Sequence, residues 1–379
     1  MFAANSNIQS VISEFRIDTM MRYSQFVPRL YNLCKSLGFK AGHIMPSRAF
    51  CSDENQGYPI ILIAKHFGTF PFNHGMVGGI VASDRHGAHA HHGRDLVIIQ
   101  ASHVGYDPDS KTFGTYRRIN TADDDATVTC GKVGAVIEWY QEEYRFAQNN
   151  IYLGRDGDNY LVTIDNQLLH EDREQGLFLH LDRLVRHDNG GPMPLRVQST
   201  SHIYQASPEL RESLPADAWP ANDRLRIGHY LSPELFKFRR TIEGDLEGRS
   251  HLEQNLINPM PWIVTSTEPL LVAAQVNTQA EFDRAFRTIV REKEYQGKKV
   301  LFIACINIDI SPREGLLFPL TKCVPWAAYI QDGAGGSRTL EQDEIVSLLR
   351  QQSTENPDQI DLEDAIQQME KIKEIKIEV

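Results

Sequence analysis

The chain of 379 residues carries a formal net charge of −11, and its apolar and charged fractions are those of an ordinary globular protein long enough for two domains. It contains no apolar run of the roughly 18 to 20 residues that span a bilayer and no basic stripe interleaved with aromatic residues, so neither a membrane nor a nucleic acid is an expected partner. Its five cysteines form an odd, sparse set that predicts reduced thiols, and the N-terminal residues do not resemble a signal peptide, so we expect a cytoplasmic protein.

The N-terminal half is predicted to be α/β. Helix-like spacing over residues 7–39 predicts two helices, separated at Pro28 and closed near Gly38. A helical period returns directly after the sequence "TVTCGKV", over residues 134–150. Between these helices lie short apolar runs whose β-branched content and lack of alternation predict buried parallel strands at 58–64, 76–83 and 95–102.

The second half is predicted as a separate α/β extension. A segment rich in Pro, Ser and Asp from about residue 192 to 220 suggests a boundary, which gives domains 1–195 and 196–379. The pattern beyond it predicts a helix at 278–296, a strand at 298–310, a turn at 332–337 and a helix at 340–352.

The C-terminal tail predicts one more helix. Asp361 is a good capping residue, and Leu362, Ile366 and Met369 then share one helical face. The mixed charges of the tail argue against a membrane helix, so we expect this face to pack on the body of the protein or on a partner subunit.

Two strand-like segments of the chain resemble each other. Residues 93–108, "GRDLVIIQASHVGYDP", align without a gap on residues 297–312, "GKKVLFIACINIDISP", and His103 then corresponds to Asn307. The likeness is either a degenerate repeat or the convergence of two similar strands.

Cys51, His103 and Cys130 are candidate metal ligands, because zinc prefers thiolate and imidazole and a catalytic zinc site has three protein ligands. His103 ends a predicted strand, Cys51 precedes one and Cys130 opens a helix. In an open α/β sheet, residues just beyond the carboxyl ends of strands gather in one crevice. The alternative for each cysteine is a small buried apolar side chain, and this is the reading we adopt for the others, Cys34, Cys305 and Cys323.

Four motifs in order strengthen the metal interpretation: "CSDE" (51–54), "MVGGIV" (76–81), "ASHVGYDPDSKTFGTYRR" (101–118) and "TCGKVGA" (129–135). Together they resemble the limiting-carbon-dioxide-inducible B/C proteins, a divergent branch of the β-type carbonic anhydrases. The resemblance covers roughly residues 10 to 190. It implies a β-carbonic-anhydrase-like central sheet flanked by helices.

The resemblance also implies functional roles. Cys51, His103 and Cys130 would bind zinc, Asp53 would be the carboxylate beside the metal, and Arg118 would be its arginine partner. Arg117 is the nearest rival for the arginine, and the acidic insert at 119–129 departs from the more basic segment of the family. The expected activity is the reversible hydration of carbon dioxide to bicarbonate, in an obligate homodimer.

Asp53 has two possible roles beside a metal. It can orient the attacking water through a hydrogen bond, or it can bind the metal as a fourth ligand and close the site, unless an arginine holds it away. The alternative is a plain turn cap.

The loop histidines and the chain as a whole each have several possible functions. The histidines of the "HGAHAHH" loop, His86, His89, His91 and His92, suit a proton shuttle, a second metal site, bicarbonate binding or a solvated loop. For the whole chain, the alternatives to an enzyme of carbon dioxide are a zinc-stabilised regulatory or scaffold protein and a hydrolase with Cys51 as nucleophile.

Overall fold

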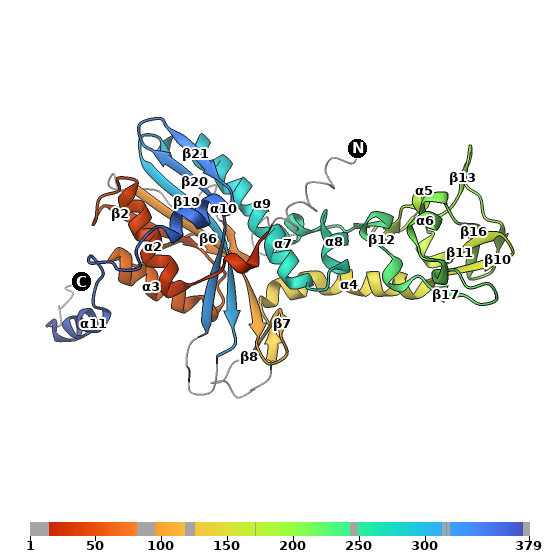
Figure 1. Ribbon diagram of the computed structural model, residues 1–379, viewed down its shortest axis with the longest axis horizontal. Helices are drawn as coiled ribbons and strands as arrows, with labels where there is room; N and C mark the ends of the chain where they lie inside the picture. The colour runs from red at the N-terminus through yellow and green to blue at the C-terminus, as the bar shows by residue number, and fades with distance from the viewer. Residues whose placement is uncertain are drawn as a thin grey trace, which may run out of the picture. The chain divides into compact units, whose positions relative to one another are not determined.

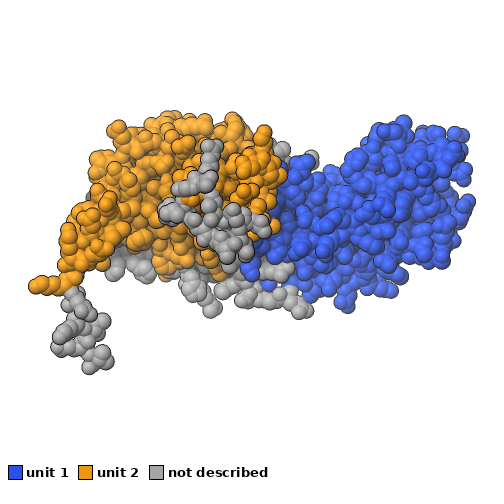
Figure 2. Space-filling model, turned by 90° about the horizontal axis from the view of Figure 1, so that it is seen from below, with its two compact units in different colours: residues 1–9, 131–273 blue, residues 10–130, 274–379 orange. Residues whose placement is uncertain are grey.

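The computed structural model describes residues 15–81, 95–117, 126–170, 172–242, 249–312, 316 and 319–373. The chain divides into two compact units, coloured in Figure 2: unit 1 holds residues 1–9 and 131–273, and unit 2 holds 10–130 and 274–379. The boundary expected at residue 195 therefore falls inside unit 1. Unit 2 combines two stretches that are distant in the chain, because strands from both pair in one sheet.

Unit 2 is built on a mixed sheet that has eight strands within the described residues, in the order β1-β20-β19-β6-β2-β3, with β21 beside β20 and β7 beside β6 (Figure 1). The four strands β19, β6, β2 and β3 run parallel, whereas β20 is antiparallel to β19. Their bounds are β1 Met21–Arg22, β2 Ile44–Ala49, β3 Phe72–Asn73, β6 Asp95–Asp107, β7 Thr112–Phe113, β19 Lys299–Ile310, β20 Leu320–Asp332 and β21 Ser337–Leu340.

The two similar segments of the sequence are neighbours in this sheet. Strands β6 and β19 pair in parallel from Leu96 opposite Val300 to Tyr106 opposite Ile310. The register has the same offset as the ungapped alignment, so Asn307 lies beside His103. Both strands are buried along almost their whole length, which explains their continuous apolar sequences.

Helices cover both faces of the sheet, and the predicted α/β class is confirmed. On one face Val97, Ile99 and Leu301 pack against α2, α3 and α10. On the other face Ile98 and Phe302 pack against α9. The alternation along β6 and β19 places every second side chain in each of these two cores. The helices are α2 Tyr23–Ser36, α3 Gly57–Phe67, α9 Pro269–Arg291 and α10 Gln342–Arg350.

The strand predicted at 58–64 is wrong, because this segment forms α3. Its buried residues recur with a helical spacing, at Pro59, Leu62, Ile63, His66 and Phe67. A proline is tolerated in the first turn of a helix, where its missing N–H group would have no partner inside the helix. A short apolar run does not by itself distinguish a buried strand from a buried helix.

Prolines and glycines account for the other corrections. The helix break predicted at Pro28 is wrong, because Pro28 lies inside α2, whose many fully buried side chains offset the lost hydrogen bond. The single strand predicted at 76–83 is replaced, within the described residues, by the short strands β4 (Gly75–Met76) and β5 (Ile80–Val81) around a glycine turn. Strands β2 and β20 were not predicted, and each of them contains a proline.

The other predicted elements of the second half are confirmed. They correspond to α9, β19, α10 and the tail helix α11 (Leu362–Lys371). Asp361 caps α11 by accepting hydrogen bonds from two backbone N–H groups. Ile366 and Met369 on its apolar face are 61% and 69% exposed, so the described part of this chain does not cover that face. Packing on a partner subunit stays a prediction.

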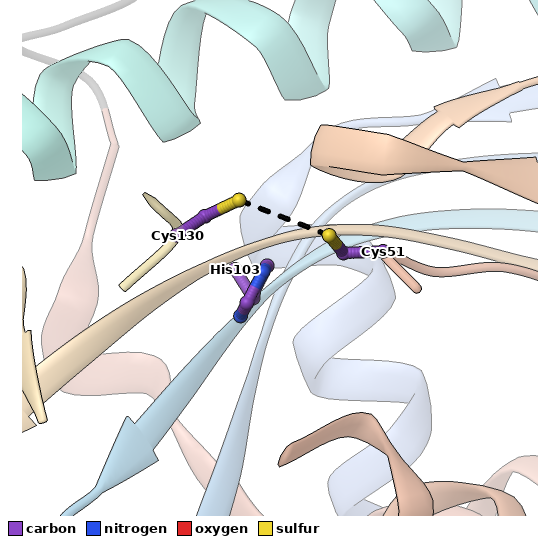
Figure 3. Close-up of side chains that lie close together, drawn as sticks. All are labelled: Cys51, His103 and Cys130. Carbon is purple, nitrogen blue, oxygen red and sulfur yellow. Dashed lines mark hydrogen bonds between the residues drawn. The ribbon is translucent and has the colours of Figure 1, made fainter. Parts of the chain in front are cut away.

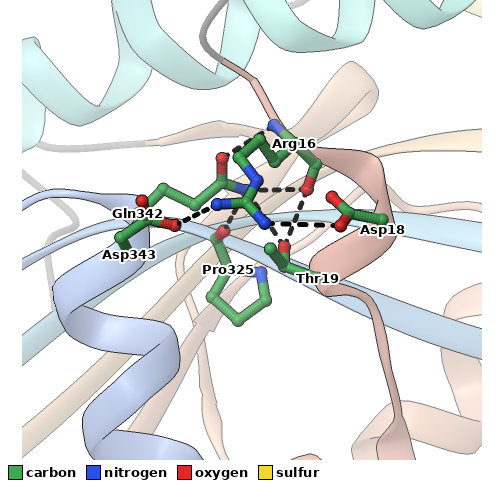
Figure 4. A network of polar contacts seen from close by, with 6 residues as sticks. All are labelled: Arg16, Asp18, Thr19, Pro325, Gln342 and Asp343. Carbon is green, nitrogen blue, oxygen red and sulfur yellow. Dashed lines mark hydrogen bonds and ion pairs between the residues drawn. The ribbon is translucent and has the colours of Figure 1, made fainter.

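A buried amide joins the two ends of unit 2 (Figure 4). At the start of α10, Gln342 donates to the carbonyl oxygen of Arg16 at 3.1 Å, to Thr19 Oγ1 at 3.2 Å and to the carbonyl oxygen of Pro325 at 3.0 Å. It also accepts from the N–H group of Arg16 at 2.7 Å. The ion pair of Arg16 with Asp343 is exposed, and exposed ion pairs add little to stability.

Unit 1 begins with the long helix α4 (Gly131–Asn150), which confirms the helix predicted there. It contains an antiparallel sheet of five strands in the order β15-β16-β11-β10-β17 and a separate pair, β12 with β18. Among the helices of the described ranges, none combines the length and apolar character needed to cross a bilayer. The bounds in unit 1 are β10 Ile151–Asp156, β11 Asn159–Asp165, β12 Gly176–Leu179, α5 Leu181–Leu184, β13 His187–Asp188, β14 Gly191–Pro192, β15 Arg196–Val197, β16 Ser201–Gln205, α6 Pro208–Ser213, β17 Leu225–Arg226, β18 Phe236–Arg239, α7 Arg249–Leu256 and α8 Met260–Thr265.

A buried histidine in unit 2 should make stability depend on pH. His74 lies with its Nδ1 atom 2.5 Å from Ser47 Oγ, and burial, more than the nearby Arg48, lowers its pKa from 6.5 to about 3. The folded state thus keeps His74 neutral while the unfolded chain takes up a proton below pH 6.5. Stability should therefore fall as the pH drops from about 6.5 towards about 3, with a slope of up to about 1.4 kcal/mol per pH unit.

We expect His74→Gln to flatten this dependence, because glutamine does not titrate. Urea unfolding of the wild type and the variant at pH 7, 6 and 5 measures the two slopes. The exposed His43 provides the control, since His43→Gln should keep the wild-type slope. Equal slopes in the wild type and His74→Gln would refute the assignment.

Candidate metal centre

Cys51, His103 and Cys130 come together in unit 2. Their ligand atoms lie within 4.8 Å of one another, and the two sulfur atoms are 3.8 Å apart (Figure 3). All three residues are buried, with exposed fractions of 4%, 1% and 2%. The structure thus brings together the three residues that the sequence analysis selected.

The parallel strands bring two of the candidate ligands together. Cys51 follows the carboxyl end of β2, and His103 lies on the neighbouring strand β6. Cys51 was predicted to precede a strand, but it follows strand β2. The rule that loops after parallel strands share one crevice therefore applies to Cys51 directly.

Backbone hydrogen bonds determine the position of Cys130, the third candidate ligand. Cys130 follows a hairpin of β8 (Thr115–Arg117) and β9 (Ala126–Val128) and precedes α4. The N–H group of Gly105, two residues beyond His103, donates to the carbonyl oxygen of Thr129 at 2.9 Å. A Cβ atom on Gly105 would lie 2.6 Å from the carbonyl oxygen of Thr115, so only glycine allows this close approach.

A glycine turn directs a backbone donor at Cys51. Gly78 and Gly79 have φ angles of +79° and +78°, and the N–H group of Gly78 donates to Cys51 Sγ at 3.1 Å. A Cβ atom on Gly79 would lie 2.3 Å from the carbonyl oxygen of Ala101. Asn277 on α9 holds the turn by donating to the carbonyl oxygen of Gly78 at 3.0 Å. The MVGGIV motif, which was predicted as a strand, therefore provides a hydrogen-bond donor to Cys51 Sγ.

Asp309 contacts His103, and the sequence analysis did not select it. Asp309 Oδ2 lies 2.8 Å from His103 Nδ1, and both side chains are fully buried. The other ring nitrogen, Nε2, has no hydrogen-bond partner in the described part of the chain. The available signal was a single acidic residue inside the otherwise apolar strand sequence "VLFIACINIDI".

The three side chains influence each other's protonation. The contact with Cys130, opposed by burial and supported by His103, lowers the pKa of Cys51. The same contact, together with burial, raises the pKa of Cys130. Burial lowers the pKa of His103, but Asp309 and the two sulfur atoms outweigh it and raise that pKa well above its usual value. The contact between the two sulfur atoms thus moves their pKa values in opposite directions, down for Cys51 and up for Cys130.

This arrangement fits a metal ion. In a tetrahedral site with metal–sulfur bonds of about 2.3 Å, two sulfur ligands are about 3.8 Å apart, and the observed separation is 3.8 Å. The unpartnered Nε2 atom supplies a nitrogen ligand. Two thiols and an imidazole are soft and borderline donors, which suit a transition-metal ion rather than calcium or magnesium.

The other predicted site residues lie apart from this group or outside the described residues. Asp53 lies outside the group of three ligands and caps a short 3-10 turn, η2 (Glu54–Gln56), where its Oδ1 atom accepts from the N–H group of Asn55 at 3.1 Å. Burial raises its pKa. Arg117 is exposed on β8. Arg118 and the loop histidines His86, His89, His91 and His92 lie outside the described residues.

No protein-family model and no curated protein matches the sequence. The structure is similar to the crystal structure of PtLCIB4, a homolog of the limiting CO2-inducible protein LCIB, with 12% identity, a TM-score of 0.48 and coverage of 88% of this chain and 99% of that chain. It is also similar to the crystal structure of LCIB, with 12% identity, a TM-score of 0.44 and coverage of 86% and 96%. At such identities the roles of single residues must follow from the geometry of this chain.

We expect the full chain to bind one Co²⁺ ion as a spectroscopic probe of the three ligands. Sulfur bound to Co²⁺ should give an ultraviolet charge-transfer band that saturates at one equivalent. Cys51→Ala and Cys130→Ala should each weaken the band strongly, since each removes one sulfur ligand. Cys34→Ala is the matched control, because Cys34 is equally buried but lies in the apolar core. A band that persists in Cys51→Ala and Cys130→Ala would contradict the site.

Proposed function

We propose that the chain binds one zinc ion through Cys51, His103 and Cys130 and catalyses the reversible hydration of carbon dioxide to bicarbonate. The observation that carries the proposal is the ligand geometry: three buried donors from separate elements, two sulfur atoms 3.8 Å apart and one unpartnered imidazole nitrogen. The order of the motifs, which resembles the limiting-carbon-dioxide-inducible proteins, supports the choice of substrate.

The donor set favours zinc. Structural zinc sites usually have four protein ligands, whereas three leave one coordination position for water or substrate. When bound, the ion supplies a Lewis acid that makes a hydroxide nucleophile available near neutral pH. Two thiolates balance its formal charge and weaken this effect, so the site needs help from other groups of the protein.

Asp53 is the residue that we propose for that help. It follows Cys51 by two residues, and its hydrogen bond with Asn55 fixes the direction of the carboxylate. From there it would accept a hydrogen bond from the attacking water and orient it towards carbon dioxide. Arg118 is proposed to hold Asp53 in place. The homodimer expected from the resemblance stays a prediction.

One observation favours the scaffold alternative, because all three ligands are buried and a structural metal needs no access for substrate. The hydrolase alternative is supported by Cys51, His103 and Asp309, which follow one another as the nucleophile, base and carboxylate of a catalytic triad do. That alternative leaves the Cys130 thiol beside the nucleophile without a role. Zinc content separates the readings, since a nucleophilic cysteine needs no metal.

The test is carbon dioxide hydration by stopped flow over about pH 7 to 9, with zinc measured on every sample. The wild type should be active. Asp53→Ala should keep the metal and lose roughly 10² to 10³ in rate, the usual effect of removing a positioned proton-handling or transition-state group. Asp53→Ser is the matched variant, because serine can still cap the turn but has no carboxylate.

Two outcomes would change the assignment. Rates of the Asp53 variants equal to or above that of the wild type would make Asp53 a blocking ligand instead of a catalytic group. A fully zinc-loaded wild type without hydration activity would favour the scaffold function.

A further inference from the structure

We propose that Asp309 is a positioning residue that fixes the tautomer and direction of His103, and that a one-way chain of buried hydrogen bonds reaching back to Tyr23 holds Asp309 in place. The inference rests on the zinc-binding part of the proposed function and is independent of the reaction. It gives the strands near the C-terminus a role at a site whose metal ligands all lie in the first 130 residues.

Three donors surround the carboxylate of Asp309, which is fully buried. Its Oδ2 atom is 2.8 Å from His103 Nδ1 and accepts from Gln56 Nε2 at 2.9 Å. Its Oδ1 atom accepts from Thr321 Oγ1 at 3.2 Å. Gln56 and Thr321 offer N–H and O–H groups to an acceptor, so the carboxylate accepts from both and from the histidine ring.

The donors are themselves oriented by a chain with one direction. The carbonyl oxygen of the Gln56 side chain accepts from Asn307 Nδ2 at 2.7 Å, and Asn307 Oδ1 accepts from the hydroxyl group of Tyr23 at 2.9 Å. Turning the Gln56 amide over would bring its oxygen against the carboxylate of Asp309. Turning the Asn307 amide over would bring its oxygen against that of Gln56. Each link therefore allows one orientation, set by the negative end at Asp309.

The chain determines which nitrogen of His103 is available to a metal. With Nδ1–H donating to Asp309, Nε2 is the ring nitrogen that faces the sulfur atoms of Cys51 and Cys130, and its lone pair is the one that the neutral ring can offer to a metal. Nε2 is also the buried nitrogen that has no partner within the described residues. A carboxylate behind a ligand histidine fixes the ring and strengthens its basicity, and removing such a group typically weakens metal binding 10- to 100-fold.

The parts of this chain come from separate elements. Tyr23 lies on α2, Gln56 in the turn just after Cys51 and Asp53, and Asn307 and Asp309 on β19, while Thr321 lies on β20. Asn307 and Asp309 are two residues apart on the strand and so point to the same face of the sheet. Because β19 pairs with β6 in register, this face is also that of His103.

The test compares the zinc affinity of the full-length wild type and Asp309→Asn by competition with a chromophoric chelator. We expect the variant to bind zinc 10- to 100-fold more weakly. Asp107→Asn is the matched control: Asp107 is also buried, and it bonds to Ser110 instead of to a ligand. It should bind zinc as the wild type does. The cobalt charge-transfer band should survive in Asp309→Asn at saturating Co²⁺, because both sulfur ligands remain, and this separates a misdirected ring from a collapsed site.

A milder variant keeps the test decisive if Asp309→Asn does not fold. Thr321→Val removes one donor from the other oxygen of Asp309 with little change of shape, and a loss of about 2- to 10-fold in zinc affinity is expected. If Asp309→Asn folds and binds zinc within twofold of the wild type, the inference is overturned and the zinc site remains. An unchanged zinc affinity in Thr321→Val has the same consequence. If instead the wild-type chain takes up no zinc, the zinc-binding part of the proposed function is overturned.

Discussion

The parallel pairing of β6 with β19 is the contact on which the rest of unit 2 depends. It joins segments some 200 residues apart in the sequence and makes the sheet continuous from β3 to β1. The same register brings Asp309 within hydrogen-bond distance of His103. The pairing also explains why the two strands have similar sequences, since both lie in the middle of the sheet between two apolar cores.

The apolar interior gives the buried polar groups their specificity. A carboxylate that leaves water without partners costs on the order of several kcal/mol, so a group such as Asp309 persists only where donors replace the lost water. Gln56, Thr321 and His103 supply those donors. The buried polar groups in turn favour the correct pairing of the strands, because a misplaced strand would leave all of these groups without partners.

The sequence allowed the α/β class, the strand at His103, the helix after Cys130 and the later helices to be predicted, because their apolar patterns are long and regular. It did not distinguish α3 from a strand, since the apolar run over 58–64 is short, and the helical spacing is clear only when His66 and Phe67 are included. The role of Gly79 depends on its distance to Ala101, and the role of Asp309 on the pairing of two distant strands. Such contacts between distant parts of the chain leave no local pattern in one sequence.

Most of unit 1, residues 131–273, separates Cys130 from the strands β19 and β20 in the order of synthesis. Asp309 follows Cys130 by about 180 residues, so at roughly 5 to 20 residues per second the ribosome delivers it about 10 to 40 seconds after the last of the three candidate ligands. Until β19 is made, the edge of β6 with which it pairs has no partner strand, and unpaired strand edges are templates for aggregation. Residues 131–273 are synthesised in that interval, and a segment that folds on its own leaves a shorter flexible loop, which lowers the entropy cost of closing the sheet.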